Sequence, residues 1–321
     1  MNYLIVGGAG FIGSYCVDEL LRLNTTKFVR VYDNFSSGKR WHLERHLSDP
    51  RLEIIASDIY DEAIYAAAEN IDAVYMFAAN PDIGRAITQP DIDFKQGTAL
   101  LQITLEAMRI AGCKKILYAS GSGVYGDVGS IAVREDFSPM RPISTYGASK
   151  LACEALLSSY CHMFDFRASA FRFGNVVGGR QTHGVAYDFI RRLRMNQKSL
   201  SVLGDGSQSK PYVYIDDVLR AMQLVAENQT TIFDVYNVAP NDYTTVTDIV
   251  NLVMEEMKIS SEGCKIEYSG GSRGWKGDVP IVRLNTEKIR QMGWSNKSTS
   301  TEAVKKSISE MQLNATKLFI N

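Results

Sequence analysis

Residues 3–13 read Tyr-Leu-Ile-Val-Gly-Gly-Ala-Gly-Phe-Ile-Gly, an apolar run followed by a glycine-rich turn and the start of an apolar helical pattern. Gly7 permits a tight turn, Gly10 lets a ligand come close to the backbone, and Gly13 lets the following helix pack against the strand. The N-terminus of that helix offers free N–H groups and a partial positive charge. The stretch predicts a strand, turn and helix that hold the pyrophosphate of a dinucleotide; an ordinary connection without a ligand is the alternative.

Asp33 directly follows a second apolar run, residues 28–32, and lies 20 residues after Gly13. A carboxylate at this place accepts hydrogen bonds from ribose hydroxyls and repels a 2′-phosphate. The predicted cofactor is therefore NAD. Lys39 and Arg40 lie nearby, and they leave NADP as the alternative.

The first half of the chain alternates apolar strands with helices. Further strands are predicted at residues 52–56, 73–79, 115–119 and 168–173, and helices at about 92–111 and 145–164. Strands this apolar, separated by helices, indicate a parallel sheet covered on both faces. We expect the α/β class, with a doubly wound parallel (Rossmann) sheet in residues 1–173. A smaller mixed α/β substrate domain is expected in residues 174–321, with segments about 211–239 returning to the first domain.

Composition excludes several classes of protein. The 321 residues include 35 Lys and Arg and 36 Asp and Glu, so no basic field is available for nucleic acid. No apolar run reaches the roughly 18 residues that span a membrane, and the N-terminus does not resemble a signal peptide. Five cysteines without a Cys-x-x-Cys pair favour reduced thiols in the cytoplasm. His42 and His46 have no third ligand, so we expect a surface helix and no metal site.

Tyr146 and Lys150 lie four residues apart and therefore on one face of a predicted helix. An ammonium group near a phenol stabilises the phenolate. Such a phenol can take the proton of a substrate hydroxyl while hydride passes to the dinucleotide. The alternative is a partly exposed pair with no catalytic role.

Five further segments complete a pattern. They are Ser57-Asp58-Ile59, Phe77-Ala78-Ala79, Arg172-Phe173-Gly174-Asn175-Val176-Val177-Gly178, Gly204-Asp205-Gly206-Ser207-Gln208-Ser209-Lys210 and Arg273-Gly274-Trp275-Lys276-Gly277-Asp278. With the glycine turn and the Tyr146/Lys150 pair, these make the chain resemble the extended short-chain dehydrogenase/reductase family. The resemblance is to its NAD-dependent sugar-nucleotide epimerases, of the UDP-glucose 4-epimerase type, and it covers nearly the whole chain.

The resemblance implies an isomerase that binds NAD and a nucleoside-diphosphate sugar, and a homodimer formed through the helices at 92–111 and 145–164. The residues that it implies for the cofactor are Gly7, Gly10, Phe11, Ile12, Gly13, Asp33, Asn34, Ser36, Gly38, Asp58, Ile59, Phe77, Ala78, Ala79, Tyr146, Lys150 and Phe173. Those for the substrate are Ser122, Asn175, Val202, Lys210, Arg273 and Asp278. The catalytic residues are Tyr146, Lys150 and Ser122. The base and the sugar stay open.

The chain departs from the family pattern at several places. Gly121 stands where the family has a catalytic Ser or Thr, so the hydroxyl is expected from Ser122, with Ser120 or water as alternatives. Phe94 stands where many members have a structural Asn. Gly123 stands where members that dehydrate the sugar carry an acid, which leaves Tyr146 as the only proton carrier.

A single proton carrier favours epimerisation at C4 through a transient 4-keto intermediate, because elimination needs a further acid or base. The main alternative is a sugar-nucleotide dehydrogenase or 4-keto reductase of the same family. A non-sugar dehydrogenase and a non-catalytic dinucleotide-sensing protein are the remaining ones.

Overall fold

The computed structural model describes residues 1–319, which divide into two compact units. The first unit contains Met1–Gly121, Thr145–Arg172 and Leu219–Tyr236. The second contains Ser122–Ser144, Phe173–Val218 and the residues from Asn237 onward. Both units therefore contain segments that lie far apart in the sequence.

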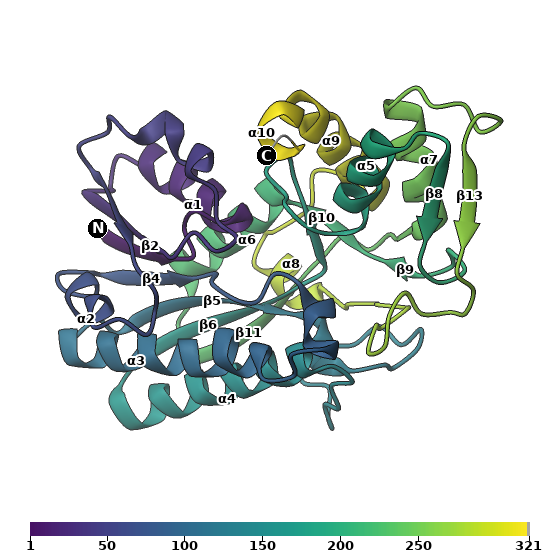
Figure 1. Cartoon of the computed structure of the whole chain (residues 1–321). Coiled ribbons are helices and arrows are strands. Elements are labelled where there is room, and N and C mark those ends of the chain that lie inside the picture. Colours follow the sequence, from purple (N-terminus) through teal and green to yellow (C-terminus); the bar gives the residue numbers. More distant parts are fainter. Residues whose placement is uncertain (320–321) are drawn as a thin grey trace. The chain divides into compact units, whose positions relative to one another are not determined.

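The first unit is built on a seven-stranded sheet in the order β11-β6-β5-β4-β1-β2-β3 (Figure 1). Parallel pairs join β1 to β2 and β4, β2 to β3, and β4 to β5. The strands are β1 (Asn2–Val6), β2 (Phe28–Asp33), β3 (Leu52–Ala56), β4 (Ala73–Met76), β5 (Lys115–Gly121), β6 (Arg167–Phe173) and β11 (Phe233–Val238). The predicted doubly wound parallel sheet is confirmed. The strand order reverses direction between β1 and β4, which is where such sheets bind ligands.

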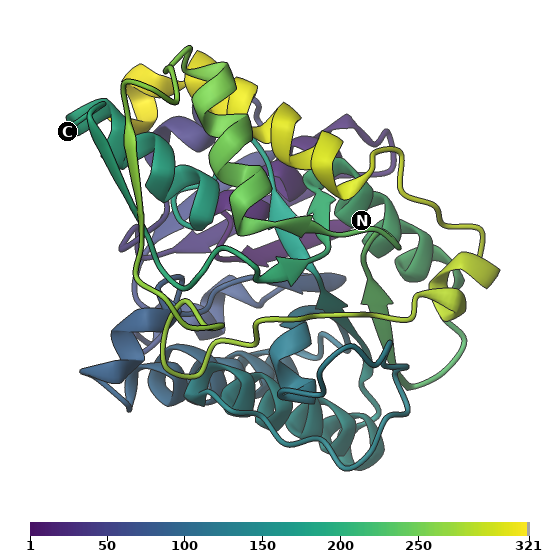
Figure 2. The same ribbon diagram turned by 90° about the vertical axis from the view of Figure 1, so that its right-hand side faces the viewer.

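Helices cover both faces of this sheet, and α3 and α4 lie side by side along one of them (Figures 1 and 2). They are α1 (Phe11–Arg22), α2 (Ala63–Ala67), α3 (Leu100–Ala111), α4 (Thr145–Phe164) and α6 (Ile215–Asn228), the last of which begins in the second unit. Leu101, Leu105 and Met108 are fully buried on α3 at the spacing of one helical face. They belong to the apolar core between α2, α3, α4 and the sheet.

Two predicted elements of this unit differ in extent. The predicted strand at 73–79 ends at Met76 as β4, because the next backbone N–H groups turn to bond Val6. The predicted helix at 92–111 is a π-helical segment, η4 (Phe94–Ala99), followed by α3. The 3₁₀ segments are η1 (Arg40–His42), η2 (Glu44–His46), η3 (Ile83–Ile87) and, in the second unit, η5 (Ser122–Tyr125).

The second unit combines helices with three two-stranded sheets. Its helices are α5 (Val185–Met195), α7 (Val246–Glu256), α8 (Glu287–Gln291), α9 (Ser300–Leu313) and α10 (Ala315–Phe319). β7 (Asn175–Val177) pairs with β10 (Tyr212–Tyr214), β8 (Ser199–Val202) with β13 (Lys265–Tyr268), and β9 (Ser209–Lys210) with β12 (Thr244–Thr245). Capping boxes at Thr245 and Thr299 fix the starts of α7 and α9, which lie side by side in Figure 2.

A buried ion pair fixes α4 to the sheet of the first unit. The Arg172 guanidinium on β6 donates to both carboxylate oxygens of Glu154 on α4, with its shortest contact at 2.6 Å. The Ser120 hydroxyl at the end of β5 donates to the same carboxylate at 2.6 Å. Glu154 and Arg172 are 4% and 2% exposed, so removing one leaves the other as a buried charge with lost partners.

Glu154→Ala should lower the free energy of unfolding by about 3–5 kcal/mol, the usual cost of removing one partner of a buried pair. Glu19→Ala is the matched control, because Glu19 and Arg22 form an exposed pair on α1 and such pairs contribute under about 1 kcal/mol. Urea unfolding followed by circular dichroism measures both. Equal losses in the two variants would contradict this role of Glu154.

Candidate active site

The glycine turn between β1 and α1 has no room for side chains at two positions. Gly7 has φ +82°, and a Cβ there would lie 2.6 Å from the backbone nitrogen of Ala78. A Cβ on Gly13 would lie 2.2 Å from the carbonyl oxygen of Gly7. The backbone N–H groups of Phe77 and Ala78 both donate to the Val6 carbonyl, at 2.9 and 3.0 Å. The ends of β1 and β4 are thus joined closely at the strand-order reversal, as a pyrophosphate-binding turn requires.

Asp33 is held against this turn. Its carboxylate accepts hydrogen bonds from the N–H groups of Ala9 and Phe35, both at 2.8 Å. Burial raises the pKa of the Asp33 carboxyl above its ordinary value, and the N–H donors of Phe35, Ala9 and Gly10 oppose that rise. Each oxygen keeps acceptor capacity beyond these bonds, which suits it to ribose hydroxyls.

Four further predicted cofactor residues, Asn34, Ser36, Gly38 and Asp58, follow the ends of β2 and β3. The side-chain amide of Asn34 donates to the Asp58 carboxylate at 2.8 Å, which joins the ends of β2 and β3. The Ser36 N–H donates to Asn34, and a Cβ on Gly38 would lie 2.8 Å from the Asp33 carboxylate. The sequence, strand ends and glycine positions therefore fit a dinucleotide that lies across the carboxyl ends of β1–β4.

His42 differs from its prediction. It lies in the short 3₁₀ segment η1 and is 1% exposed, with Nδ1 2.7 Å from the Ala9 carbonyl oxygen. The predicted surface helix is therefore wrong for His42, which packs against the glycine turn. His46 instead contacts Asp18 at 2.8 Å. Within residues 1–319, no group of three or more His, Cys, Asp and Glu side chains could hold a metal ion.

Lys150 is buried next to Tyr146 on α4. Its ammonium nitrogen lies 5.4 Å from the centre of the Tyr146 ring and 4.8 Å from that of Tyr118. It donates to the carbonyl oxygen of Ala119 at 2.6 Å, and the residue is 4% exposed. The bond to β5 holds the positive charge in place, so the ammonium can stabilise negative charge on the Tyr146 oxygen.

The two candidate serines differ in their surroundings. Ser120 is 5% exposed, and its hydroxyl donates to Glu154. Gly121, at the family's hydroxyl position, has open space where a Cβ would stand, with no atom within 4 Å. Ser122 begins η5 and is half-buried. Ser120 therefore has a structural partner within the first unit.

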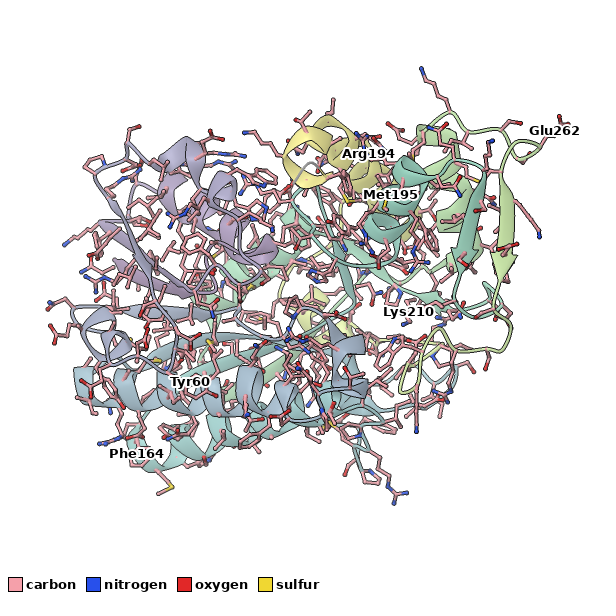
Figure 3. All side chains as sticks on the ribbon, in the orientation of Figure 1. Tyr60, Phe164, Arg194, Met195, Lys210 and Glu262 are labelled. Carbon is pink, nitrogen blue, oxygen red and sulfur yellow. The ribbon has the colours of Figure 1, made fainter. Side chains whose placement is uncertain are left out.

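The second unit brings together the predicted phosphate-binding residues. Lys210 on β9 forms an ion pair with Asp278 at 2.6 Å (Figure 3 labels Lys210). Arg273 pairs with Asp127 at 2.5 Å and also donates to the Asp278 carbonyl. Asp127 lies shortly after η5, and no local pattern in the sequence indicated its pairing with Arg273.

Three predicted residues lie at strand ends. Asn175 begins β7, and Phe173, which ends β6, is buried. Val202 ends β8 with 1% exposure, whereas the neighbouring Leu203 is 52% exposed.

Among the described residues, no helix is long and apolar enough to cross a membrane.

Comparison with known proteins decides the family. Residues 3–239 match the model of the NAD dependent epimerase/dehydratase family. The chain belongs to this family. The predictions of the family and of NAD as the cofactor are thereby confirmed.

Individual relatives agree with this assignment. The chain is 28% identical over 318 residues to a putative UDP-glucose 4-epimerase of Methanocaldococcus jannaschii, covering 97% of this chain and 98% of that protein. It is 31% identical over 227 residues to a UDP-glucose 4-epimerase of Mycolicibacterium smegmatis, covering 69% and 72%. A crystal structure of UDP-galactose 4-epimerase superposes with a TM-score of 0.85 at 35% identity, covering 98% and 99%. The crystal structure of the UDP-glucose 4-epimerase of Thermotoga maritima superposes with a TM-score of 0.86 at 29% identity. This match covers 98% of this chain and 100% of that one.

Asp33→Asn should weaken binding of NAD by about tenfold or more, because the amide loses acceptor capacity for the ribose hydroxyls. The preference of the variant for NAD over NADP should also be smaller than that of the wild type. Titration of cofactor-free protein by calorimetry gives both dissociation constants. Asp49→Asn is the control, since Asp49 lies outside the predicted cofactor residues and pairs with Arg51. An unchanged NAD:NADP preference in Asp33→Asn would contradict the assignment.

Proposed function

We propose that this protein is an NAD-dependent isomerase that inverts C4 of a nucleoside-diphosphate sugar through a transient 4-keto intermediate. The observation that carries the proposal is the Tyr146–Lys150 pair on α4, with its ammonium buried 5.4 Å from the phenol ring. The pair lies in the same unit as the glycine turn and Asp33. The relatives named above, which are UDP-glucose and UDP-galactose 4-epimerases, support this reaction.

The predicted site residues of the first unit have separate roles in this reaction. The glycine turn holds the pyrophosphate of NAD, and Asp33 holds its ribose. Bound NAD would supply the hydride acceptor and donor for C4 of the sugar. Tyr146 takes the proton of the C4 hydroxyl and later gives it back, while the Lys150 ammonium stabilises the phenolate.

Ser122 supplies the hydroxyl that bonds the sugar oxygen. Two observations support it over Ser120: the Ser120 hydroxyl donates to Glu154, and Ser120 is buried. The open space at Gly121 leaves room for water to share this role. Gly123 carries no proton donor, which supports epimerisation over elimination.

Residues of the second unit hold the nucleotide part of the substrate. Lys210 and Arg273 bind its pyrophosphate, and Asn175 and Val202 contact the nucleotide sugar. Lys210 pairs with Asp278, and Arg273 pairs with Asp127. The substrate phosphates therefore either displace these carboxylates or bind the cations beside them. Of the two, the Arg273–Asp127 pair is the more exposed and hence the easier to displace.

We also propose that the chain works as a homodimer through α3 and α4. Ile110 on α3 and Met163 on α4 are 63% and 70% exposed, and Phe94 before α3 is 60% exposed. Apolar side chains on two adjacent helices suit burial against the same helices of a second copy. Light scattering across a range of concentrations should give twice the mass of one chain. A single-chain mass at every concentration would contradict the proposal.

The proposed location is the cytoplasm. All five cysteines are buried and free of disulfides. Cysteines without disulfides are typical of proteins in a reducing compartment.

Tyr146→Phe should lower kcat by about 10²–10⁴, the usual contribution of general acid–base catalysis, and change KM little because the ring remains. Tyr65→Phe is the control, since Tyr65 is an exposed tyrosine on α2. A panel of nucleotide sugars first identifies the substrate that the wild type converts. Near-normal turnover by Tyr146→Phe would overturn the mechanism.

Ser122→Ala should also lower kcat, but by less, because water can occupy the space at Gly121. Ser120→Ala should mainly lower the free energy of unfolding, since its hydroxyl supports Glu154. The two variants are compared by turnover and by urea unfolding. A larger loss of kcat in Ser120→Ala would transfer the catalytic hydroxyl to Ser120.

A further inference from the structure

Asp93 is a buried carboxylate that contacts two functional segments of the first unit. It is 2% exposed and lies directly before η4. One carboxylate oxygen accepts a hydrogen bond from the Asn80 side-chain amide at 2.8 Å. The other accepts from the Thr145 hydroxyl at 2.7 Å. Asn80 directly follows the cofactor-lining residues Phe77–Ala79, and Thr145 directly precedes Tyr146.

The backbone of the same segment contacts α4 a second time. The Ser149 hydroxyl donates to the Asp93 carbonyl at 2.7 Å and lies 2.9 Å from the Thr98 hydroxyl. A Cβ on Gly97 would stand 2.2 Å from the Ser149 oxygen, so only glycine permits this approach. Ser149 directly precedes Lys150. Both members of the Tyr146–Lys150 pair therefore have a neighbour that is bonded to Asp93.

Phe94, the residue after Asp93, has no polar side-chain atom and cannot make such hydrogen bonds. The family resemblance places a structural Asn at the position of Phe94, and Phe94 is apolar and 60% exposed. The Tyr60 hydroxyl donates to the carbonyl of Lys95, the residue after Phe94, at 2.8 Å (Figure 3 labels Tyr60). In this chain Asp93 bonds both to the first residue of α4 and to Asn80 beyond β4, while Thr98 of η4 adds a contact with Ser149 on α4.

We propose that Asp93 is a positioning residue, which sets the Tyr146 phenol relative to the cofactor-lining end of β4. The proposal rests on the proposed function, in which Tyr146 carries the proton. Both carboxylate oxygens of Asp93 have a donor from a different element, so the three segments can only shift together. The first turn of α4 also offers its positive dipole end to the carboxylate. Proton and hydride transfer require such fixed geometry, and a misplacement of about 1 Å can cost about 10² in rate.

Thr145→Val is the main test, because valine keeps the branched shape and removes only the hydroxyl. Thr145 is exposed, so the substitution leaves the core intact. We expect kcat to fall about tenfold, with KM for the nucleotide sugar and the Kd of NAD within about twofold of wild type. Thr145→Ser restores the hydroxyl and should recover kcat to within about twofold. Asp93→Asn keeps an acceptor for Asn80 and a polar group for Thr145, and should lose less than Asp93→Ala.

Ser159→Ala is the matched control on the same helix, because Ser159 is exposed and its hydroxyl bonds only within α4 at 2.8 Å. Its kcat should equal that of wild type. A second readout uses the protein without substrate: backbone amides 149–152 of α4 should exchange hydrogen at least about threefold faster in Thr145→Val, and at the wild-type rate in Ser159→Ala.

Wild-type kcat and exchange in Thr145→Val, or a Thr145→Ser variant as slow as Thr145→Val, would overturn the role of Asp93. A loss of kcat accompanied by an equal loss of NAD affinity would overturn it as well, since that result indicates general disorder. The proposed function is tested separately by Tyr146→Phe. If that variant stays active while amide exchange in Thr145→Val rises, the proposed proton carrier fails and the contact of Asp93 with α4 stands.

Discussion

The close contact between the ends of β1 and β4 is the constraint on which the first unit depends. A hydrogen atom is all that fits on Gly7 opposite the Ala78 backbone, and the Gly7 carbonyl leaves no room for a side chain on Gly13. The parallel sheet continues outward from this contact in both directions. Every loop that follows a strand from β1 to β4 therefore emerges at one edge. The predicted cofactor residues between positions 7 and 79 lie on or beside these loops.

Buried polar contacts then fix α4, which carries Tyr146 and Lys150, against the sheet. Glu154 bonds to β5 and β6, Lys150 bonds to the carbonyl of Ala119 on β5, and Thr145 and Ser149 bond to Asp93. These contacts are distributed over the first half of α4, so they fix both its rotation and its position along its axis. The same helix could pack through apolar contacts alone, but apolar packing tolerates small shifts that proton transfer does not.

Local patterns predicted much of this arrangement. Glycine spacing, the apolar strands, the position of Asp33 and the four-residue spacing of Tyr146 and Lys150 all follow from short-range rules. The ties between Asp93 and Thr145, 52 residues apart, and between Arg273 and Asp127, 146 residues apart, depend on how distant segments meet. The segment before α3 was predicted as plain helix, and the structure has the π-helical η4 there, with Ser149 of α4 close to its Gly97. Local spacing does not indicate such an approach from another helix.

The central claim is that one phenol moves the proton and that the hydrogen removed from C4 returns to the same sugar. A nucleotide sugar with deuterium at C4, incubated with the protein and added unlabelled NAD, tests it most directly by mass spectrometry and NMR of both epimers. Deuterium should stay at C4 in both substrate and product, with none in the added NAD. Deuterium that appears in the added dinucleotide, with a 4-keto or reduced sugar as the end product, would contradict epimerisation and indicate a dehydrogenase or reductase.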